Sequence, residues 1–507
     1  MTSSLWPVPS IGTLALRALR RHPDRIAFVD DSGSLSYAAT TDMIGRFQHV
    51  LAAHGLSAGD RLAVLAGNSA QAWSLGIAAQ ASRITMSWLH PMGSLDDQRH
   101  QLADLDATAC VVDVRGRAER AAELAESNVP VFTLGHSEIG PDLLAEAHAA
   151  GAVTARDMGR PDDPLMVNYT GGTTGRAKGV LRRNAGLAAM AYGIAADFEI
   201  PFHARFLTAA PITHVAGTKV LPVLCRGGTV FLHNGFDPAR LLATIERDRI
   251  TMTLAVPTMV YALLDHPDFE RTDLSSLELL LYGAAPMSPT RLDEGLARIG
   301  PVFSQLYGQT ECYPIAALRR EEHDDPSLRG SCGAPVANVE VTLLDADGNP
   351  VPTGEAGEIC ARGPATMAEY WRQPELTAHA FAGGWLHTGD VARADERGYL
   401  TIVDRIKDMI ISGGFNVYPR EVEDALSSHP AVATAAVFGR PDDRWGEAVT
   451  AAVILRPGAT ATAEELIEHV RERKGSVQAP KAVRFLDAFP TTSVGKIDKK
   501  SLRANWI

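Results

Sequence analysis

The stretch "YTGGTTGRAKGV", residues 169–180, contains four glycines, three threonines and a lysine. The preceding "PLMVNY" (164–169) predicts a short buried strand, and the following "LRRNAGLAAMAYGIAADF" (181–198) predicts a helix. Glycines let backbone N–H groups approach a bound anion closely, and threonine hydroxyls, a lysine and a helix N-terminus add donors and positive potential. The common GxxxxGK[ST] loop is not matched. The composition nevertheless favours a polyphosphate site over the alternative of a flexible surface loop.

The size and composition of the chain indicate a folded protein of two or three domains. It has 507 residues, of which 46% are hydrophobic and 21% charged. A net charge of −12 argues against a nucleic-acid-binding protein. Five scattered cysteines without a CxxC pair fit a reducing cytoplasm and predict no zinc site. Neither a signal peptide nor an apolar run of about twenty residues is present, so we expect a soluble cytoplasmic protein without a membrane span.

Strand and helix patterns alternate regularly between residues 160 and 310. Apolar segments such as "GTVFLH" (228–233) and "LELLLYG" (277–283) predict strands. Helices are predicted between them, with starts marked by Asp237-Pro238 and Ser288-Pro289. This rhythm predicts a parallel sheet covered by helices, and the first 150 residues show a similar, less regular alternation.

The pattern changes twice in the C-terminal part. Closely spaced strands and turns over 336–404 predict a small, mostly antiparallel subdomain. The segment 407–507 offers a helix, two strands, a second helix and a final strand, which predicts a separate α+β domain. We therefore expect an α/β protein with a large N-terminal domain, 1–406, and a small C-terminal domain, 407–507.

Four further motifs follow the glycine-rich loop, and each has an ordinary explanation when taken singly. The first two end in acids that suit Mg²⁺ or ribose hydroxyls but are more often solvated or turn residues. The third places a glycine pair before a helix, and the fourth is a polar loop around a lysine. They are "LYGQTE" (306–311), "WLHTGD" (385–390), "DRIKDMIISGGFNVYPREVE" (404–423) and "TTSVGKIDKK" (491–500).

In this order the five motifs resemble those of the adenylate-forming superfamily, which includes acyl-CoA synthetases, peptide-synthetase adenylation domains and beetle luciferases. The resemblance covers essentially the whole chain and is greatest to aryl- and acyl-CoA ligases. It implies that a carboxylate attacks the α-phosphorus of MgATP to give acyl-AMP and pyrophosphate, after which coenzyme A displaces AMP. It also implies that the C-terminal domain is mobile and rotates about a hinge at Lys407.

The resemblance implies roles for particular residues. Lys496 would contact the carboxylate and α-phosphate, Glu311 would hold Mg²⁺, and His214 would act as a switch beside the carboxylate. The nucleotide- and CoA-binding residues would be Thr170, Gly171, Gly172, Thr173, Thr174, Gly175 and Lys178 for the phosphates, Gly283, Ala284, Ala285, Tyr307 and Gly308 for adenine, Thr310 for the α-phosphate, Asp390 and Arg405 for the ribose, and Gly413 and Gly414 for pantetheine.

The pocket candidates suggest the class of acid. Small side chains leave room, so we expect a bulky aromatic, alicyclic or polycyclic acid. "PITHVAG" (211–217) has no aspartate to pair an amino group, which disfavours an amino acid. Lys219 lies next to this segment and is expected to face solvent. The pocket candidates are His214, Val215, Gly217, Thr218, Gly283, Gly308 and Cys332.

Two alternatives stay open. Phe415 stands where many relatives carry glutamate, so the chain could be an acyl-AMP ligase that passes its adenylate to a partner ligase or carrier protein. A non-catalytic nucleotide-binding or scaffold protein is disfavoured because Lys496, Glu311 and Asp390 are all present. Gly171 and Ala177 replace the serine and proline usual in the loop, with little expected loss. A homodimer is compatible with the sequence.

Overall fold

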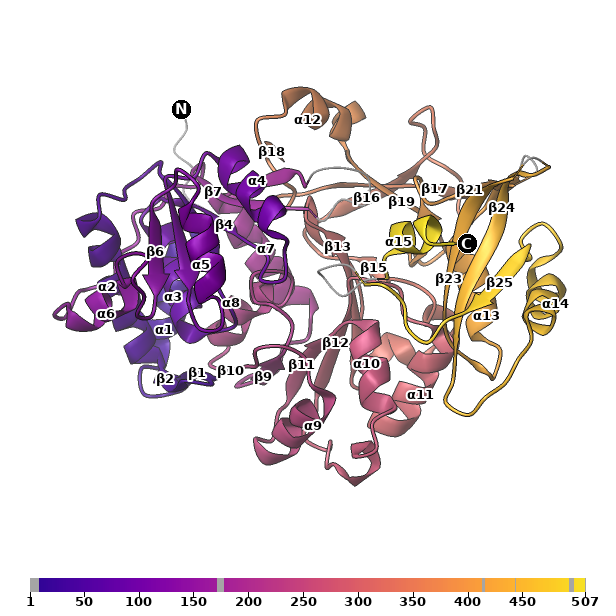
Figure 1. Ribbon diagram of the computed structural model, residues 1–507, viewed down its shortest axis with the longest axis horizontal. Coiled ribbons are helices and arrows are strands. Elements are labelled where there is room, and N and C mark those ends of the chain that lie inside the picture. Colours follow the sequence, from indigo (N-terminus) through magenta and orange to yellow (C-terminus); the bar gives the residue numbers. More distant parts are fainter. Residues whose placement is uncertain (1–8, 171–176, 413–414, 443, 492–496, 507) are drawn as a thin grey trace.

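The computed structural model describes residues 9–170, 177–412, 415–442, 444–491 and 497–506. The N-terminal part of the chain lies at one end of the molecule and the C-terminal part at the other, with the strands of the middle of the chain between them (Figure 1). The elements build two large mixed sheets and two smaller ones.

The first large sheet has seven strands, and the five from β7 to the edge strand β6 are parallel. β8 and β18 extend one edge in antiparallel fashion. β3, β4 and β5 are buried on both faces, as expected for a parallel sheet covered by helices. In spatial order the strands are β18 (Glu369–Tyr370), β8 (Gly179–Arg183), β7 (Pro164–Tyr169), β4 (Thr85–Trp88), β3 (Arg61–Leu65), β5 (Ala109–Asp113) and β6 (Val131–Leu134).

The second large sheet has nine strands, six of them parallel, and it confirms the parallel sheet expected between residues 160 and 310. Antiparallel strands close both edges. The order is β15 (Ala334–Pro335), β14 (Cys312–Leu318), β13 (Phe303–Gln309), β12 (Leu279–Gly283), β11 (Met252–Ala255), β9 (Arg205–Thr208), β10 (Thr229–Leu232), β1 (Ile26–Asp30) and β2 (Gly33–Ser36).

Helices fill the space between the large sheets and cover their outer faces. α3 is apolar on every side because it contacts strands of both sheets, and its small residues allow that approach: a side chain at Gly76 would meet the Trp88 ring at 3.0 Å. α9 starts as expected, with Asp237 accepting from the backbone N–H of Arg240 at 2.8 Å. The helices of this part are α1 (Ile11–Arg21), α2 (Tyr37–Ala53), α3 (Ala70–Ala81), α4 (Leu95–Leu105), α5 (Ala118–Ala125), α6 (Leu143–Ala149), α7 (Asn184–Asp197), α8 (Gly217–Cys225), α9 (Pro238–Arg247), α10 (Pro257–Leu264), α11 (Pro289–Ile299) and α12 (Pro374–Ala380).

The two smaller sheets come from the C-terminal third of the chain. An antiparallel sheet of β16 (Glu340–Leu344), β17 (Ala356–Arg362), β19 (Leu386–Ala394) and β20 (Leu400–Arg405) forms in the segment expected to be antiparallel. The last sheet has its own apolar core and is packed by α13 and α14. Its elements are β21 (Ile410–Ser412), β22 (Phe415–Val417), α13 (Pro419–Ser427), β23 (Val432–Asp442), β24 (Gly446–Leu455), α14 (Ala463–Lys474) and β25 (Ala482–Phe485), followed by α15 (Lys499–Ala504).

Two local expectations were wrong. The glycine-rich loop is followed by β8 and not by a helix, since residues 179–183 pair antiparallel with β7 and α7 begins only at Asn184. The loop therefore lies between two strands, β7 and β8. Likewise, a short strand, β22, follows residue 414 and pairs antiparallel with β21, and α13 begins later, at Pro419.

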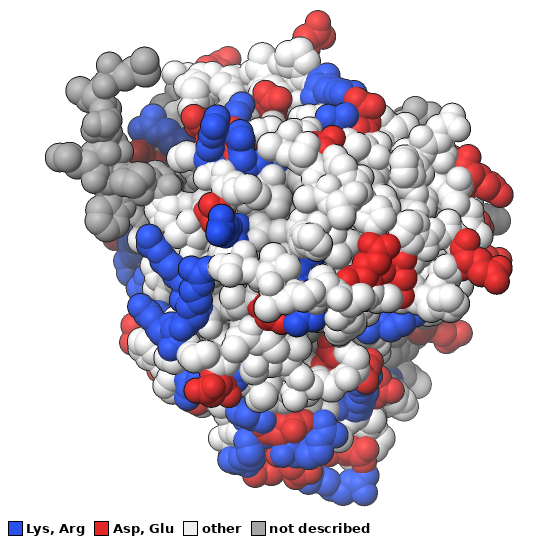
Figure 2. Space-filling model, turned by 90° about the vertical axis from the view of Figure 1, so that its left-hand side faces the viewer, with Lys and Arg blue, Asp and Glu red and all other residues white. Residues whose placement is uncertain are grey.

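The charges of the folded chain are mixed. Figure 2 shows acidic and basic side chains interspersed on one face around a broad uncharged area. In the described part of the chain, no helix is both long enough and apolar enough to cross a membrane.

Asn68, which follows β3, ties the two large sheets together. Its buried side-chain amide donates to the carbonyl oxygens of Ala210 at 3.0 Å and His233 at 2.8 Å, and its Oδ1 accepts from the N–H of Ile212 at 2.8 Å. These contacts fix the segment that leads from β9 to His214.

We predict that Asn68→Ala lowers the free energy of unfolding by about 2–4 kcal/mol, because it leaves buried backbone groups without partners. The measurement is urea unfolding followed by far-ultraviolet circular dichroism, with the exposed Asn349→Ala as the matched control. An unchanged midpoint for Asn68→Ala would contradict the bridging role.

Candidate active site

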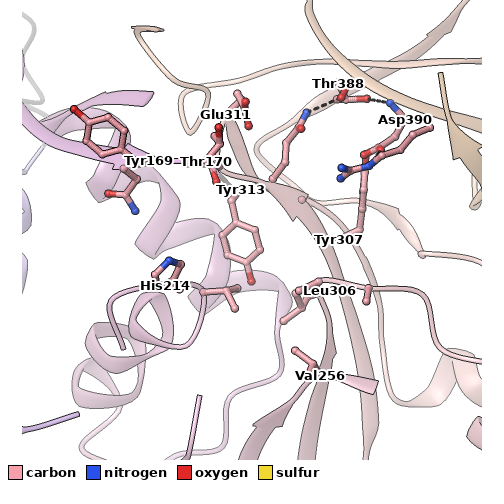
Figure 3. A pocket seen from close by; sticks show the side chains of 18 of the residues that line it. Tyr169, Thr170, His214, Val256, Leu306, Tyr307, Glu311, Tyr313, Thr388 and Asp390 are labelled. Atoms are coloured by element: carbon pink, nitrogen blue, oxygen red, sulfur yellow. Dashed lines mark hydrogen bonds and ion pairs between the residues drawn. The ribbon is translucent and has the colours of Figure 1, made fainter. Parts of the chain in front are cut away.

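A cavity of about 3230 Å³ extends from the ends of the large sheets to the C-terminal elements. Its lining includes residues of both large sheets, of β19 and of α15, so it is far larger than a pocket for one small molecule. Figure 3 shows part of it, with side chains from several elements pointing into a common space.

The carboxyl ends of β12 and β13 form one wall of the cavity. The two strands are parallel, and Gly283 pairs with Leu306, so the segment after β12 lies beside Tyr307 and Gly308. β13 then turns into the antiparallel β14 through Thr310 and Glu311. Ala284, Ala285 and the whole run from Leu306 to Glu311 line the cavity. The fold thus brings together the residues expected around adenine and the α-phosphate.

Asp390 is the best-defined acidic group of the site. Its side chain is buried, with the residue 4% exposed, and it joins two other predicted residues. The hydroxyl of Tyr307 donates to Oδ2 at 2.7 Å, and Nε of Arg405 donates to Oδ1 at 2.9 Å. Asp390 raises the pKa of Arg405, and burial followed by Asp390 raises the pKa of Tyr307 well above its ordinary value. Both partners stay protonated, so they hold the carboxylate in one position.

Glu311 is oriented by a residue that the sequence analysis missed. The hydroxyl of Tyr370, on β18, donates to Oε1 at 2.8 Å, whereas no described residue donates to Oε2. The Nζ of Lys178 lies 5.4 Å from the centre of the Tyr370 ring. A carboxylate with one oxygen fixed and the other facing a cavity is suited to Mg²⁺. The missing signal was the pairing of β18 with β8, which joins segments about 190 residues apart.

Arg182 is a second residue that the sequence analysis missed. Its guanidinium is buried and donates to the carbonyl oxygens of Thr310 and Ala365, both at 2.6 Å. The backbone N–H of Met367 donates to the Glu311 carbonyl at 2.6 Å. The turn between β13 and β14 is therefore held by its main chain, which leaves the side chains of Thr310 and Glu311 available to the cavity.

The glycine-rich loop begins and ends at the cavity. Thr170 and Lys178 line it, and the N–H of Thr170 donates to the Lys178 carbonyl at 3.0 Å. The predicted phosphate-binding residues Gly171, Gly172, Thr173, Thr174 and Gly175 lie outside the described residues.

His214 is partly buried in the wall of the cavity. Its Nδ1 is 2.8 Å from the Thr213 hydroxyl, and its ring centre is 4.5 Å from that of His90. Burial, together with the neighbouring His90, lowers the pKa of His214 to about 4. Burial also lowers the pKa of His90. His214 is therefore a neutral imidazole at physiological pH.

Three glycines of the expected pocket are required by the protein's own packing. A Cβ at Gly217 would lie 1.7 Å from the Ile212 carbonyl, and one at Gly283 would lie 2.2 Å from the Leu306 carbonyl. A Cβ at Gly308 would meet the Tyr313 ring at 2.7 Å. The protein's own packing therefore explains why these three residues are glycines. Their small size does not indicate extra space for a substrate, so the prediction of a bulky acid no longer rests on them. Val215, Thr218 and the buried Cys332 do line the cavity.

The expectation that Lys219 faces solvent was wrong. The residue is 0% exposed and lies behind the pocket wall, between Phe198 and Tyr313. It begins α8 beside Thr218. The pattern failed because the first turn of α8 packs inward against α7, which a short helix with a central proline did not indicate.

The fold also groups ligand-type side chains that the cysteine spacing did not predict. Antiparallel pairing of β17 with β19 places Cys360 opposite His387. The Sγ of Cys360 is 3.5 Å from Nδ1 of His387, and Glu358 accepts at 2.7 Å from the same nitrogen. The ligand atoms of the three residues lie within 4.8 Å of one another. The expectation of no zinc site stays a prediction, since the proximity of three such side chains does not by itself bind a metal.

The C-terminal elements border the same cavity. Lys407, Thr491, Ile497 and Asp498 line it, whereas Lys496 lies outside the described residues. Gly413 and Gly414 are also outside them, and the adjoining Phe415 is 61% exposed. A polar contact joins the C-terminal elements to the rest of the chain: Arg420 on α13 donates to the carbonyl of Met287, which precedes α11, at 2.9 Å.

Comparison with known proteins agrees with this geometry. The sequence model of the AMP-binding enzyme family matches residues 16–371, and that of the AMP-binding enzyme C-terminal domain matches residues 421–496. The chain is 42% identical over 515 residues to a medium/long-chain-fatty-acid–CoA ligase of Mycobacterium tuberculosis, covering 98% of this chain and 90% of that protein.

Two further comparisons cover nearly whole chains. A feruloyl-CoA synthase of Amycolatopsis sp is 37% identical, with 98% of this chain and 99% of that protein covered. The solved structure of the amide bond synthetase McbA from Marinactinospora thermotolerans is similar with a TM-score of 0.90 and 35% identity, covering 97% of this chain and 99% of that one. The chain therefore belongs to the AMP-binding enzyme family, the adenylate-forming proteins that its five motifs resemble.

Proposed function

We propose that the protein is an AMP-forming acid–thiol ligase that converts a carboxylic acid, ATP and coenzyme A into an acyl-CoA, AMP and pyrophosphate. The observation that carries this proposal is the alignment of two charged groups along one cavity wall: Asp390 with Tyr307 and Arg405, and Glu311 oriented by Tyr370. The first group suits ribose hydroxyls, and the second suits Mg²⁺ on the phosphates.

The first half-reaction needs positioning and not a general base, because the carboxylate is ionised at neutral pH. Charge develops as the carboxylate oxygen attacks the α-phosphorus and pyrophosphate leaves. Lys496 and Thr310 would neutralise it, Glu311 would hold the Mg²⁺ that supplies further positive charge, and the 170–178 loop with Lys178 would bind the β- and γ-phosphates. Adenine would lie between Tyr307 and the 283–285 segment.

The second half-reaction would follow rotation of the C-terminal domain, 407–507, about Lys407. The rotation would withdraw Lys496 and bring the hairpin around Gly413 and Gly414 to the cavity, where the pantetheine thiol would attack the acyl carbonyl and release AMP. Polar contact between the C-terminal and N-terminal domains, as between Arg420 and Met287, suits reversible docking. The boundary at residue 406 is part of this proposal.

For the acid we propose a bulky aromatic, alicyclic or polycyclic compound. The feruloyl-CoA synthase acts, by its name, on an aromatic acid, and the M. tuberculosis relative on medium- and long-chain fatty acids. The apolar lining around Val215, Leu221 and Leu306 accommodates either class.

A second candidate is an acyl-AMP ligase whose acceptor is not coenzyme A. It is favoured by the 35% identity to an amide bond synthetase over 97% of the chain and by the exposed Phe415, which stands where a glutamate is common. The acceptor would then be an amine, a partner ligase or a carrier protein.

The test is incubation with MgATP and a panel of acids, each with no acceptor, with coenzyme A or with a simple amine, followed by mass spectrometry. Acyl-CoA formed from one class of acid supports the ligase. Acyl-AMP that accumulates with coenzyme A and is consumed by amine supports the second candidate. No adenylate from any acid would overturn both.

We predict that Glu311→Gln lowers the rate of adenylation by about 100- to 1000-fold, because it removes the charge that holds Mg²⁺. Tyr370→Phe should lower it by roughly 10-fold and raise the Mg²⁺ concentration for half-maximal rate, because Glu311 loses its orienting hydrogen bond. Pyrophosphate release at varied Mg²⁺ measures both. The half-exposed Tyr192→Phe is the control, and an unchanged Mg²⁺ dependence in Tyr370→Phe would refute the orienting role.

We predict that Lys496→Ala lowers adenylation by about 100-fold or more and leaves thioester formation from supplied acyl-AMP nearly unchanged. Lys407→Pro fixes a backbone angle at the hinge and should slow one half-reaction selectively. Each half-reaction is measured separately, with the exposed Lys474→Ala, outside the cavity lining, as the control. Equal loss of both half-reactions in Lys496→Ala would contradict the two-orientation mechanism.

We predict that kcat/KM for adenylation shows no inflection near pH 6.5 over the range from about pH 5.5 to about pH 9. The pKa of His214 is lowered to about 4, so the residue is neutral throughout and gains a charge only at lower pH. His90→Asn removes a like charge and should shift the acid limb upward. An inflection near pH 6.5 in the wild type that disappears in His214→Asn would contradict the burial of His214.

A further inference from the structure

Lys219 is a fully buried amine within an apolar part of the protein. Its Nζ lies 4.3 Å from the centre of the Tyr313 ring and 5.2 Å from that of Phe198. It donates to the carbonyl of Val215 at 3.3 Å and to the hydroxyl of Thr218 at 3.0 Å, and it is hydrogen-bonded to the hydroxyl of Tyr313.

No described carboxylate forms an ion pair with Lys219. Its three hydrogen-bond partners among the described residues are neutral oxygens, and burial lowers the pKa of the amine well below its ordinary value. An unpaired buried amine is costly to maintain, and an apolar side chain of similar volume would fill the same space. Packing alone therefore does not account for a lysine here.

The two residues whose hydroxyls are hydrogen-bonded to Lys219 line the cavity, although Lys219 itself does not. Thr218 and Tyr313 are both lining residues. In Figure 3 the Tyr313 ring extends from the side of Glu311 and Thr170 toward Leu306 and Val256, so its hydroxyl is directed away from the phosphate end. The helices α7 and α8 contribute mainly apolar lining around it: Leu187, Met190, Ala191 and Leu221.

We infer that Thr218 and Tyr313, supported by Lys219, form a polar subsite that binds an oxygen atom at the distal end of the carboxylic acid. The substrate class is then an acid whose ring system or chain carries a hydroxyl, carbonyl or second carboxylate remote from the reacting carboxylate. This inference rests on the proposed function, since it concerns the acid that the enzyme activates.

The donors and acceptors of the cluster are consistent with this role. Thr218 donates to the Val215 carbonyl at 2.7 Å, so its proton is already used. When an N–H of Lys219 donates to the Tyr313 oxygen, the Tyr313 proton is left for an acceptor in the cavity. An acid ending in a methyl group would cover these hydroxyls without replacing their hydrogen bonds, and such sites discriminate strongly against the analogue that lacks the polar group.

The test measures kcat/KM for adenylation with acids of matched size. Each pair has one member ending in a hydroxyl and one ending in a methyl group, in two series: para-substituted phenylpropanoic acids and straight-chain acids. A third member ending in a carboxylate shows whether the bound oxygen is charged. We expect the oxygen-bearing member to be preferred by roughly 10- to 100-fold in the series that fits.

Three variants and a control separate recognition from folding. Tyr313→Phe, Lys219→Met and Thr218→Val should reduce the preference toward unity while the methyl-ended acids keep or improve their kcat/KM. Tyr37→Phe removes a fully buried hydroxyl that donates to the Gly228 carbonyl away from the cavity, and it should leave the preference unchanged. Thermal unfolding checks that each variant is folded.

Wild-type enzyme that activates both members of every pair equally, or prefers the methyl-ended one, overturns the inference and leaves the proposed function standing. Variants that lower both members in equal proportion give Lys219 a structural role only and also overturn it. Wild-type enzyme that forms no adenylate from any acid overturns the proposed function, and the inference with it. The ratio of kcat/KM values for the two members of a pair, measured with the wild-type enzyme, tests the inference even if a variant fails to fold.

Discussion

The two carboxylate oxygens of Asp390 accept hydrogen bonds from two different sheets. Oδ2 accepts from Tyr307 on the nine-stranded sheet, and Oδ1 accepts from Arg405 at the end of β20, two residues before Lys407. A buried carboxylate with two charged or polar partners is stable only while both stay in place, because loss of either leaves a poorly solvated group. The same interaction therefore fixes the cavity wall at Tyr307 and the position of Arg405, the last residue of β20.

Much of the architecture can be predicted from local sequence pattern, and the predictions that were wrong share one cause. The alternation of apolar strands with helices starting at Asp237 and Ser288 predicts the parallel part of the nine-stranded sheet, and the closely spaced strands and turns of 336–404 predict the antiparallel sheet. The segment after the glycine-rich loop was misassigned because its first residues pair with β7 and also with β18, which lies about 190 residues further along. Such pairing overrides helix propensity and leaves no local signal.

The residues of the site also fall into two groups, those that local motifs predict and those that they do not. Motifs identify the residues that would face a ligand, such as Glu311 and Asp390, because ligand chemistry restricts the residue type there. The residues that hold them, Tyr370 and Arg182, act through hydrogen bonds whose partners are distant in sequence. Packing adds a constraint of the same kind at Gly217, Gly283 and Gly308, where neighbouring backbone or ring atoms leave no room for a Cβ, and this cannot be read from a pocket motif.

The acyl end of the cavity differs physically from the nucleotide end. Beside Asp390 and Glu311, charged groups face the cavity and suit a ligand with phosphates and hydroxyls. Beside Tyr313, the amine of Lys219 is removed from the cavity and only hydroxyls are presented, which lets the wall donate a hydrogen bond without exposing a charge to an apolar substrate.

Burying the lysine behind two hydroxyls also makes their position depend on α8. Because α8 follows directly on His214, a change in the acid that moves this helix also moves the histidine nearest the expected carboxylate. Selection of the acid and its alignment for adenylation thus share one structural element.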